Sequence, residues 1–491
     1  MPKSAILTEG PIGRNLFLFA LPILAGNIAQ SLNGSINAIW VGRYLGEAAL
    51  TAAANANSIM FFLTGSVFGI GMAATILIGQ AMGARDSVQA RKVMGTSASF
   101  FGGLSAAIAL LGWYLSPHLL AAMGTPAASQ ALAEDYLRVI FLAMPTLYLF
   151  AFFSAALRGT GDARTPFRFL LLSVVLDVVF NPLLLFGIGP FPALGIAGSA
   201  WATLIAQVAA LAGLLLYLRQ KRHVLWLGRR DMRLFRIDTA ILRALIVKGV
   251  PMGLQMVMIS LAMIAMLSLV NGFGTATSAA FGAGLQLWNY VQMPAMAVGA
   301  ACSSMAAQNV GAGLWPRVDA VARTGIAANF LMTGLLIVLL IVFDRWTLAL
   351  FLPEGSATLE IARHLNHIAI WSFLLFGVSF VVSGVVRATG AVIPPLLILG
   401  FSLWGVRVPL ANVLLPHLGA DAVWWSFPIS SACSMLLSLA YYRWGGWRKA
   451  RMLSTATPPP ELAAAAEVPA HPASPVADTA PIADVPQPRQ R

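Results

Sequence analysis

The chain has 491 residues, of which 58% are hydrophobic and only 10% are charged. A typical soluble domain carries about 25% charged residues, so this composition leaves too little polar surface to cover a water-soluble globule. The formal net charge of +13 would suggest nucleic acid as a partner of a soluble protein, but the positions of the basic residues favour a membrane protein. We therefore expect neither a soluble enzyme nor a nucleic-acid-binding protein.

Apolar stretches long enough to cross a hydrocarbon layer, about 20 residues each, recur along the chain. Because the backbone inside a bilayer must satisfy its own hydrogen bonds, each stretch is predicted to be a helix. The alternating segments of about ten residues that build a membrane β-barrel are not seen. The twelve predicted spans are 16–40, 50–78, 93–115, 136–157, 167–186, 196–218, 244–270, 278–305, 320–343, 365–386, 393–415 and 423–442.

Two segments differ from the membrane spans and suggest the domain organisation. The basic stretch 219–240 is predicted to be a cytoplasmic linker between a six-helix bundle at 1–218 and a second one at 241–451. The last segment, 452–491, is rich in Pro, Ala and small polar residues and cannot bury enough apolar surface to fold. We predict a disordered tail there.

Lys and Arg residues lie almost entirely on one side of the predicted spans. With the N-terminus inside, the side that would face away from the cytoplasm carries only Arg43, Arg138, Arg345 and Arg363. The positive-inside rule therefore predicts that both termini are cytoplasmic. No cleaved signal peptide is expected at residues 1–10.

Short motifs recur at a nearly constant offset between the two halves. The pairs are Pro22 and Pro251 (251 − 22 = 229), 157–161 and 386–390 (386 − 157 = 229), and 80–83 and 308–311 (311 − 83 = 228). Each half has an even number of spans, so the halves run in the same direction and form a parallel repeat about an axis along the membrane normal. Repeats of this kind are a transporter architecture, with the substrate site near the midplane between the halves.

The same segments resemble the multidrug and toxic compound extrusion (MATE) transporters of bacterial type over about residues 10–450. The most telling stretches are Val41-Gly42-Arg43-Tyr44-Leu45-Gly46, Gly79-Gln80-Ala81-Met82-Gly83-Ala84, Leu157-Arg158-Gly159-Thr160-Gly161-Asp162 and Asn181-Pro182-Leu183-Leu184-Leu185-Phe186-Gly187. The resemblance implies an all-α integral membrane protein with twelve helices in two six-helix bundles and a central cleft. It also implies export of small organic, often cationic, compounds against H⁺ or Na⁺ at a bacterial inner membrane. We expect a monomer in the lipid bilayer that needs no cofactor and no bound metal.

Asp177 is the one carboxylate predicted to lie well inside a span. It lies 177 − 166 = 11 residues beyond Pro166, or roughly 16 Å into the membrane at 1.5 Å per residue. Asn181 is one turn further on the same face. A carboxylate buried in a low dielectric binds a proton more readily, and an ionised one could hold a cationic drug or Na⁺. The structural alternative is a hydrogen-bonded Asp that fixes a helix–helix contact.

The resemblance leaves Asp177 with neutral partners. Bacterial members usually carry an acid in helix one where this chain has Asn37, and helix five often shows Asn before an acid, the reverse of Asp177 and Asn181. A second branch uses an acid in helix seven, where this chain has Gln255. We expect Asp177 to couple transport together with Asn37 and Asn181. Because Na⁺ favours several oxygens with a net negative charge, H⁺ is favoured over Na⁺.

Further polar and aromatic residues inside the spans are candidates to line a substrate cavity. They are Gln30, Asn33, Gln255, Gln286, Asn289, Tyr290 and Arg407. Amides can equally serve as hydrogen bonds between helices, and Tyr290 can anchor the chain at the membrane interface. Arg407 adjoins the repeat position of Asp177 (177 + 229 = 406); it could pair with backbone carbonyls or with Asp177, and a structural role is favoured.

Two other functions compete with a secondary-active exporter that works by alternating access. A flippase for lipid-linked saccharides would need a cleft lined with cations for phosphates, and Arg407 is the only clear cation in the middle of a span. An integral-membrane transferase would need carboxylate, His or Cys clusters at the membrane surface, and it would not explain the repeat. No P-loop is present, so ATP is not the expected energy source.

Overall fold

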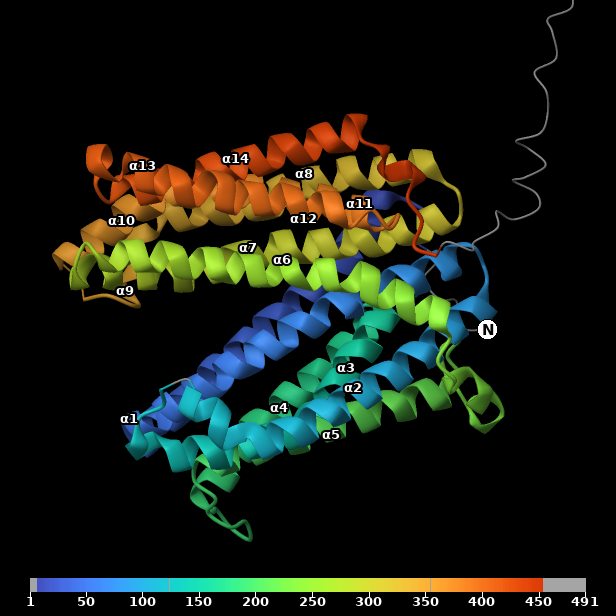
Figure 1. The fold of residues 1–491 in the computed structure, drawn as a ribbon, viewed down its shortest axis with the longest axis horizontal. Coiled ribbons are helices and arrows are strands. Elements are labelled where there is room, and N and C mark those ends of the chain that lie inside the picture. The colour runs from blue at the N-terminus through green and yellow to red at the C-terminus, as the bar shows by residue number, and fades with distance from the viewer. Residues whose placement is uncertain (1–6, 123, 354, 454–491) are drawn as a thin grey trace, which may run out of the picture. The chain divides into compact units, whose positions relative to one another are not determined.

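The computed structural model describes the backbone of residues 7–122, 124–353 and 355–453. It also describes their side chains, except at 47, 48, 61, 62, 64, 66, 127, 128, 229 and 230. Every regular element in these ranges is helical (Figure 1). The predicted tail at 452–491 lies almost entirely outside the described residues.

The first half of the chain forms five helical elements. These are α1 (Ile12–Gly83), α2 (Ser87–Ala122), α3 (Ala127–Gly159), α4 (Arg164–Phe186) and α5 (Ile196–Gln220). α1 contains two predicted spans, because the chain turns back at Gly46, where φ is 83° and ψ is −177°. Glycine adopts this conformation without the steric cost that a Cβ atom would bring.

The second half contains more elements, because two predicted spans are interrupted. In order they are the 3₁₀ turn η1 (Arg229–Phe235), α6 (Thr239–Asn271), α7 (Thr275–Gly311), α8 (Trp315–Val342), α9 (Asp344–Ala349), α10 (Ala357–Ala369), α11 (Ser372–Arg387), α12 (Ile393–Gly400), the π-helical η2 (Phe401–Arg407), α13 (Val408–Leu418), α14 (Asp421–Trp444) and η3 (Gly446–Lys449). The predicted span at 365–386 falls on α10 and α11, and the one at 393–415 falls on α12, η2 and α13. All twelve predicted spans are therefore helical.

Ten helical segments in the described chain are long and apolar enough to cross a membrane. The second part of α1 and the 37-residue α7 are not among the ten. α7 packs against α1 of the first half as well as α8, α10 and α11 of the second half, so protein rather than lipid covers much of it. Outward-facing helices instead expose large apolar side chains, such as Leu110 at 74% and Leu331 at 69%. An all-helical membrane fold is confirmed.

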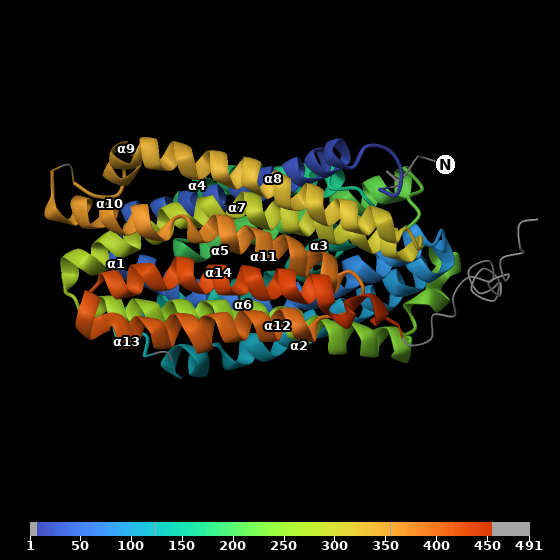
Figure 2. The same ribbon diagram turned by 90° about the horizontal axis from the view of Figure 1, so that it is seen from above.

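The helices form two lobes, which we call the N-terminal lobe (α1–α5) and the C-terminal lobe (α6–α14). In Figure 1 the N-terminal lobe lies below the C-terminal one, and in Figure 2 most of the long helices run along a common direction. α1 joins the lobes by packing against both α6 and α7. The boundaries 1–218, 219–240 and 241–451 remain predictions.

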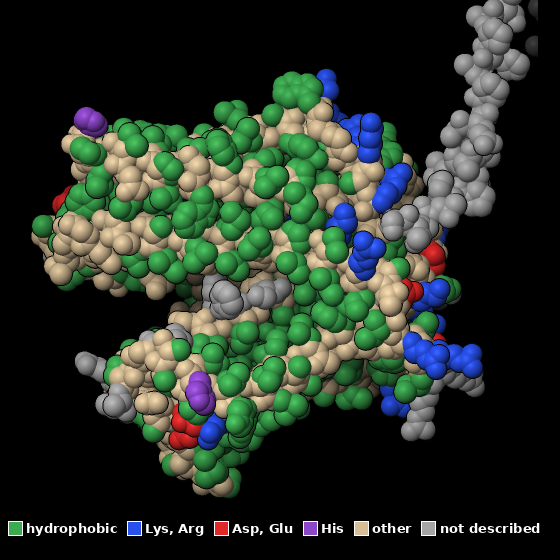
Figure 3. Space-filling model, in the orientation of Figure 1, with side chains coloured by type: hydrophobic (Ala, Val, Ile, Leu, Met, Phe, Trp, Pro, Cys, Tyr) green, Lys and Arg blue, Asp and Glu red, His purple; other side chains and the backbone are tan. Residues whose placement is uncertain are grey.

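The two ends of the lobes differ in charge and in shape. Most of the Lys and Arg side chains visible in Figure 3 gather at one end, which we call the basic end. The start of α1 lies at this end, as do the connections from α1 to α2 and from α5 to α6 (Figure 1). The face between the lobes is hollowed, and this hollow opens at the opposite end (Figure 3).

Candidate functional site

Asp177 lies where α1, α4 and α5 meet in the N-terminal lobe, and its side chain is buried. Its Oδ2 atom accepts hydrogen bonds from the side-chain amides of Asn33 at 2.7 Å and Asn37 at 2.8 Å. Its Oδ1 atom accepts a hydrogen bond from the Thr203 hydroxyl at 3.0 Å. All three donors are neutral, so hydrogen bonds rather than an ion pair hold this carboxylate in place.

Helical periodicity places the polar residues of this site. Each of the three helices contributes two side chains four residues apart, which puts them on one face. The pairs are Asn33 and Asn37 on α1, Asp177 and Asn181 on α4, and Ser199 and Thr203 on α5. Together we call these six residues the Asp177 cluster. Asp177 lies 177 − 164 = 13 residues into the 23-residue α4, just past the middle of the helix.

Asn181 connects the cluster and leaves it with spare acceptors. Its Nδ2 atom donates to Asn37 Oδ1 and to Ser199 Oγ, both at 2.9 Å. The Oδ1 atoms of Asn33 and Asn181 are buried and have no hydrogen-bond partner. Since buried polar atoms are nearly always paired in native proteins, these two unpaired oxygens near a carboxylate are acceptors that a cation could use.

The Thr203 hydroxyl can turn between two acceptors. Besides Asp177, it lies 3.2 Å from the backbone carbonyl oxygen of Ser199. A hydroxyl has one proton to donate and two lone pairs, so Thr203 can give its proton to either acceptor. This makes the hydrogen bonding around Asp177 adjustable.

The structure brings four of the predicted residues together: Asp177, Asn181, Asn37 and Asn33. Gln30, one helical turn before Asn33, is exposed. Ser199 and Thr203 were not predicted. Their spacing of four within the span 196–218 was the available signal, but small hydroxyl residues in membrane helices usually serve helix packing.

The candidate residues of the second half do not gather at one point. Arg407 Nε donates to Ser430 Oγ at 2.9 Å, and its guanidinium lies over the Phe427 ring at 4.5 Å. Both contacts are on α14, so Arg407 is held inside the C-terminal lobe by contacts other than Asp177. Gln255 is buried, and its Oε1 atom accepts a hydrogen bond from Arg387 on α11 at 2.7 Å. On α7, Gln286 and Asn289 are exposed and Tyr290 is half-buried.

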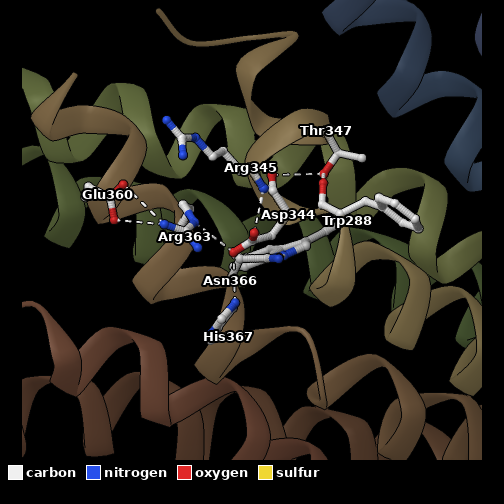
Figure 4. A network of polar contacts seen from close by, with 9 residues as sticks. Trp288, Asp344, Arg345, Thr347, Glu360, Arg363, Asn366 and His367 are labelled. Carbon is white, nitrogen blue, oxygen red and sulfur yellow. Dashed lines mark hydrogen bonds and ion pairs between the residues drawn. The ribbon is translucent and has the colours of Figure 1, made fainter. Parts of the chain in front are cut away.

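A second polar network holds the outer corner of the C-terminal lobe together (Figure 4). Buried Asp344 accepts hydrogen bonds from Arg363 Nε at 2.9 Å, from His367 Nε2 at 2.9 Å and from the backbone N–H of Arg345 at 2.6 Å. Burial works to raise the pKa of Asp344, but the Arg363, Arg345 and His367 contacts outweigh it and lower that pKa below its ordinary value. This network ties α9 to α10 at the end opposite the basic end.

At the basic end, repeat-related glutamines hold the two lobes together. Gln80 Nε2 on α1 donates to the carbonyl oxygen of Ala388 at 2.7 Å, and Gln308 Nε2 on α7 donates to that of Gly159 at 2.9 Å. The donors are 308 − 80 = 228 residues apart and the acceptors 388 − 159 = 229. We call these two contacts the glutamine seam.

Two glycines allow the backbones of the seam to approach closely. A Cβ atom on Gly83 would lie 1.8 Å from the carbonyl oxygen of Gln308, and one on Gly311 would lie 2.0 Å from that of Gln80. Neither distance is possible for a real side chain, so both positions require glycine. These glycines are also repeat partners, which makes the seam nearly symmetric.

A family model described as MatE matches residues 22–183 and again residues 251–413. The starts of the two matches are 251 − 22 = 229 residues apart and the ends 413 − 183 = 230, so the predicted internal repeat is confirmed.

Curated relatives match the chain over nearly its whole length. The Bacillus subtilis protein named probable multidrug resistance protein YoeA is 39% identical over 440 residues, which cover 89% of this chain and 95% of the relative. YpnP of the same organism, also named a probable multidrug resistance protein, is 33% identical over 92% of this chain and 99% of its own.

Among solved structures, the fold is similar to that of a multidrug resistance MATE family transporter in an outward-facing conformation. The TM-score is 0.83 at 20% identity, and the match covers 90% of this chain and 98% of the other.

Proposed function

Because the chain belongs to the MATE family of multidrug transporters, we propose that it exports small organic, often cationic, compounds in exchange for protons. Members of this family are transporters rather than enzymes, so a membrane transferase is set aside. The observation that carries the proposal is Asp177, a buried carboxylate held only by neutral donors that can be rearranged.

The charge distribution supports an orientation for this transport. Basic residues gather at one end of both lobes (Figure 3), and the positive-inside rule would put that end in the cytoplasm of a bacterial inner membrane. The hollow between the lobes would then open to the outside, while the glutamine seam closes the cytoplasmic end. Alternating access would follow if the lobes rocked, parting the seam and closing the outer end.

Asp177 is suited to gain and lose a proton without leaving a polar group unpaired. In the ionised state, the Thr203 hydroxyl donates to Oδ1. When Oδ1 is protonated, it can donate to Thr203 Oγ1 instead, and the Thr203 hydroxyl then turns to the carbonyl oxygen of Ser199. Oδ1 of Asp177 and the Thr203 hydroxyl are hydrogen-bonded in both states, so neither state is destabilised by an unpaired group at this contact.

The same contacts favour H⁺ over Na⁺. Two amide N–H groups, from Asn33 and Asn37, point at Oδ2 of Asp177 and would repel a metal cation there. Sodium would need several oxygens around it, and the free Oδ1 atoms of Asn33 and Asn181 supply two. Sodium coupling is therefore the alternative that an experiment must separate from proton coupling.

Exposed polar residues are the best candidates for substrate contact. Gln30 on α1, together with Gln286 and Asn289 on α7, is exposed, and Tyr290 is half-buried. An aromatic face beside amide groups suits organic cations, in keeping with the multidrug names of the relatives. The buried Gln255 and Arg407 fit a structural role better than direct substrate contact.

The proposal is tested by transport in liposomes. A fluorescent organic cation is followed under an imposed proton gradient or an imposed sodium gradient, for the unmodified protein, Asp177→Asn and Asp135→Asn. Asp135 is an exposed carboxylate of the same lobe, so its variant controls for the loss of a charge. A proton gradient alone should drive transport, and only Asp177→Asn should abolish it.

Two other results would contradict the proposal. Transport driven by sodium alone would overturn proton coupling. If the folded protein moves no cation under either gradient, the exporter proposal fails, and a lipid-linked saccharide becomes the next substrate to test.

A further inference from the structure

A small cavity lies inside the C-terminal lobe between α6, α11 and α12. Its volume is about 20 Å³, enough for a single water molecule or an ion of similar size. Polar side chains on its wall include Gln255 from α6 and Arg387 from α11. The rest of the wall is largely apolar, with Phe376 and Phe380 from α11 and Leu399 from α12.

Arg387 presents unused hydrogen-bond donors in this cavity. It is only 2% exposed, and one of its nitrogens, Nη1, donates to Gln255 Oε1 at 2.7 Å. Its Nε and Nη2 atoms are buried without a partner, and so is Nε2 of Gln255. The guanidinium also lies over the Phe380 ring at 5.3 Å, which compensates only part of its charge. Three nitrogen donors therefore have no acceptor.

The helices around the cavity supply no counter-charge. α6, α11 and α12 contain no Asp or Glu, and their only charged residues are Arg243, Lys248 and Arg387. Arginine cannot give up its proton in a protein, and a buried charge without a partner is strongly destabilising. Of the described helices that pack against α11, α8 and α14 carry Asp319 and Asp421, but these acids are bonded to Arg448 and His364. No carboxylate lines the cavity itself, so a bound anion is the counter-charge that the site lacks.

We propose that this cavity binds one small monovalent anion the size of chloride, held by Arg387 and by the amide of Gln255. The cavity is too small for an organic substrate, and a water molecule would accept hydrogen bonds without neutralising the guanidinium. The Ser379 hydroxyl, which also faces the cavity, is bonded to Ser434 and Ser438 and contributes little. The bound anion fixes α6 against α11.

Anion binding is measured on the purified full-length protein, so the result does not depend on which compound is transported. Chloride is replaced by gluconate at constant ionic strength, and both the Tm and the equilibrium binding of radioactive chloride are recorded. We expect one chloride per chain and a lower Tm in gluconate, because a ligand that binds only the folded state stabilises it. No binding together with an unchanged Tm would overturn the proposal.

A nearly isosteric variant locates the site. Gln255→Glu places a carboxylate within hydrogen-bond distance of Arg387 and so supplies an internal counter-charge. This variant should bind no chloride, and its Tm should be the same in chloride and in gluconate. The control is Gln220→Glu, the same change at an exposed position of α5, which should bind chloride as the unmodified protein does.

Two outcomes of the variant experiment would count against the site. Chloride binding retained by Gln255→Glu would place the anion elsewhere. If Gln255→Glu does not fold, competition of bromide with chloride on the unmodified protein still decides whether a halide-sized site exists.

Discussion

The Thr203 hydroxyl is the donor to Asp177 that the proposed proton exchange requires. Thr203→Val keeps the shape of the side chain and removes the hydroxyl, so ionised Asp177 loses one of its three donors. Proton-driven transport should therefore slow by roughly fivefold, since such a hydrogen bond is worth about 1 kcal/mol. Transport rates under an imposed proton gradient measure this.

Thr203→Ser is the matched control, because it keeps the hydroxyl and should transport at the rate of the unmodified protein. An unchanged rate for Thr203→Val would show that Thr203 takes no part in proton transfer.

Asp344 should make the outer corner of the C-terminal lobe sensitive to acid. Because its pKa is lower in the folded protein than in the unfolded one, it contributes stability above its ordinary pKa, and this is lost as the pH falls through the folded value. Asp344→Asn should cost about 1–2 kcal/mol at pH 7, and the difference should shrink below about pH 4. Thermal unfolding at both pH values measures this.

Glu360→Gln controls for the removal of an acid near Arg363. Glu360 is an exposed partner of Arg363, so its loss should cost less than about 0.5 kcal/mol. Equal effects of the two variants would contradict the role given to Asp344.

At the residue scale, sequence predicts the charged centre of the site better than its surroundings. Asp177 stands out because an acid inside an apolar span has few structural uses. Asn33, Asn37 and Asn181 follow from helical spacing. Thr203 does not, because which face of α5 meets α4 depends on packing that hydropathy does not encode.

The elements of the glutamine seam meet so closely that glycine is required. Gly83→Ala would place a methyl group on the backbone of Gln308 and push α1 away from α7 at the basic end. We expect a lower Tm and greater access of water to the seam. Access is measured as labelling of a cysteine placed at the buried Ala307 by a membrane-impermeant maleimide, in a background without the two native cysteines.

Gly282→Ala on α7 is the matched control. No atom lies within 4 Å of its Cβ position, so the change should be neutral or stabilising by up to about 1 kcal/mol, because alanine favours a helix. Equal labelling in both variants would show that close packing at Gly83 does not seal the basic end.

At the element scale, hydropathy locates helices but not their irregularities. It predicts a single helix at 393–415, where the structure has the π-helical η2 between α12 and α13. Pro409 lies two residues after the end of η2 and cannot donate a backbone hydrogen bond, which disturbs the regular pattern before it. Hydropathy indicates which residues lie in the membrane. It does not indicate the hydrogen-bonding pattern of the backbone within a span.

At the scale of the whole molecule, the two repeats share a fold and differ in chemistry. The constant offset predicts two bundles and the symmetric seam between them. It does not predict that polar residues gather around Asp177 in one lobe, while the adjacent repeat position in the other lobe holds Arg407, bound to α14. The repeat fixes the backbone, while the buried charged side chains Asp177 and Arg407 of the two lobes differ in sign.

The glutamine seam should set the balance between the two access states of the transporter. Gln80→Leu removes one hydrogen bond between the two halves of the chain. Gln308→Leu removes two, because Gln308 Oε1 also accepts a hydrogen bond from the backbone N–H of Leu7 at 2.9 Å. Each bond is worth about 1 kcal/mol, so Gln80→Leu should favour opening at the basic end by roughly fivefold and Gln308→Leu by more. The double variant should open this end further than either single variant, but not by the simple product, because the two glutamines lie on packed neighbouring helices. The distance between spin labels placed on the two lobes at that end measures the populations.

The two single variants should differ in the size of their effect. Each glutamine closes the same end from the opposite lobe, so both variants should shift the population, and the additional Leu7 contact of Gln308 should make the shift larger for Gln308→Leu. A shift in only one of them would mean that one contact carries the closure, and no shift in the double variant would mean that the glycine contacts hold the lobes together without the glutamines.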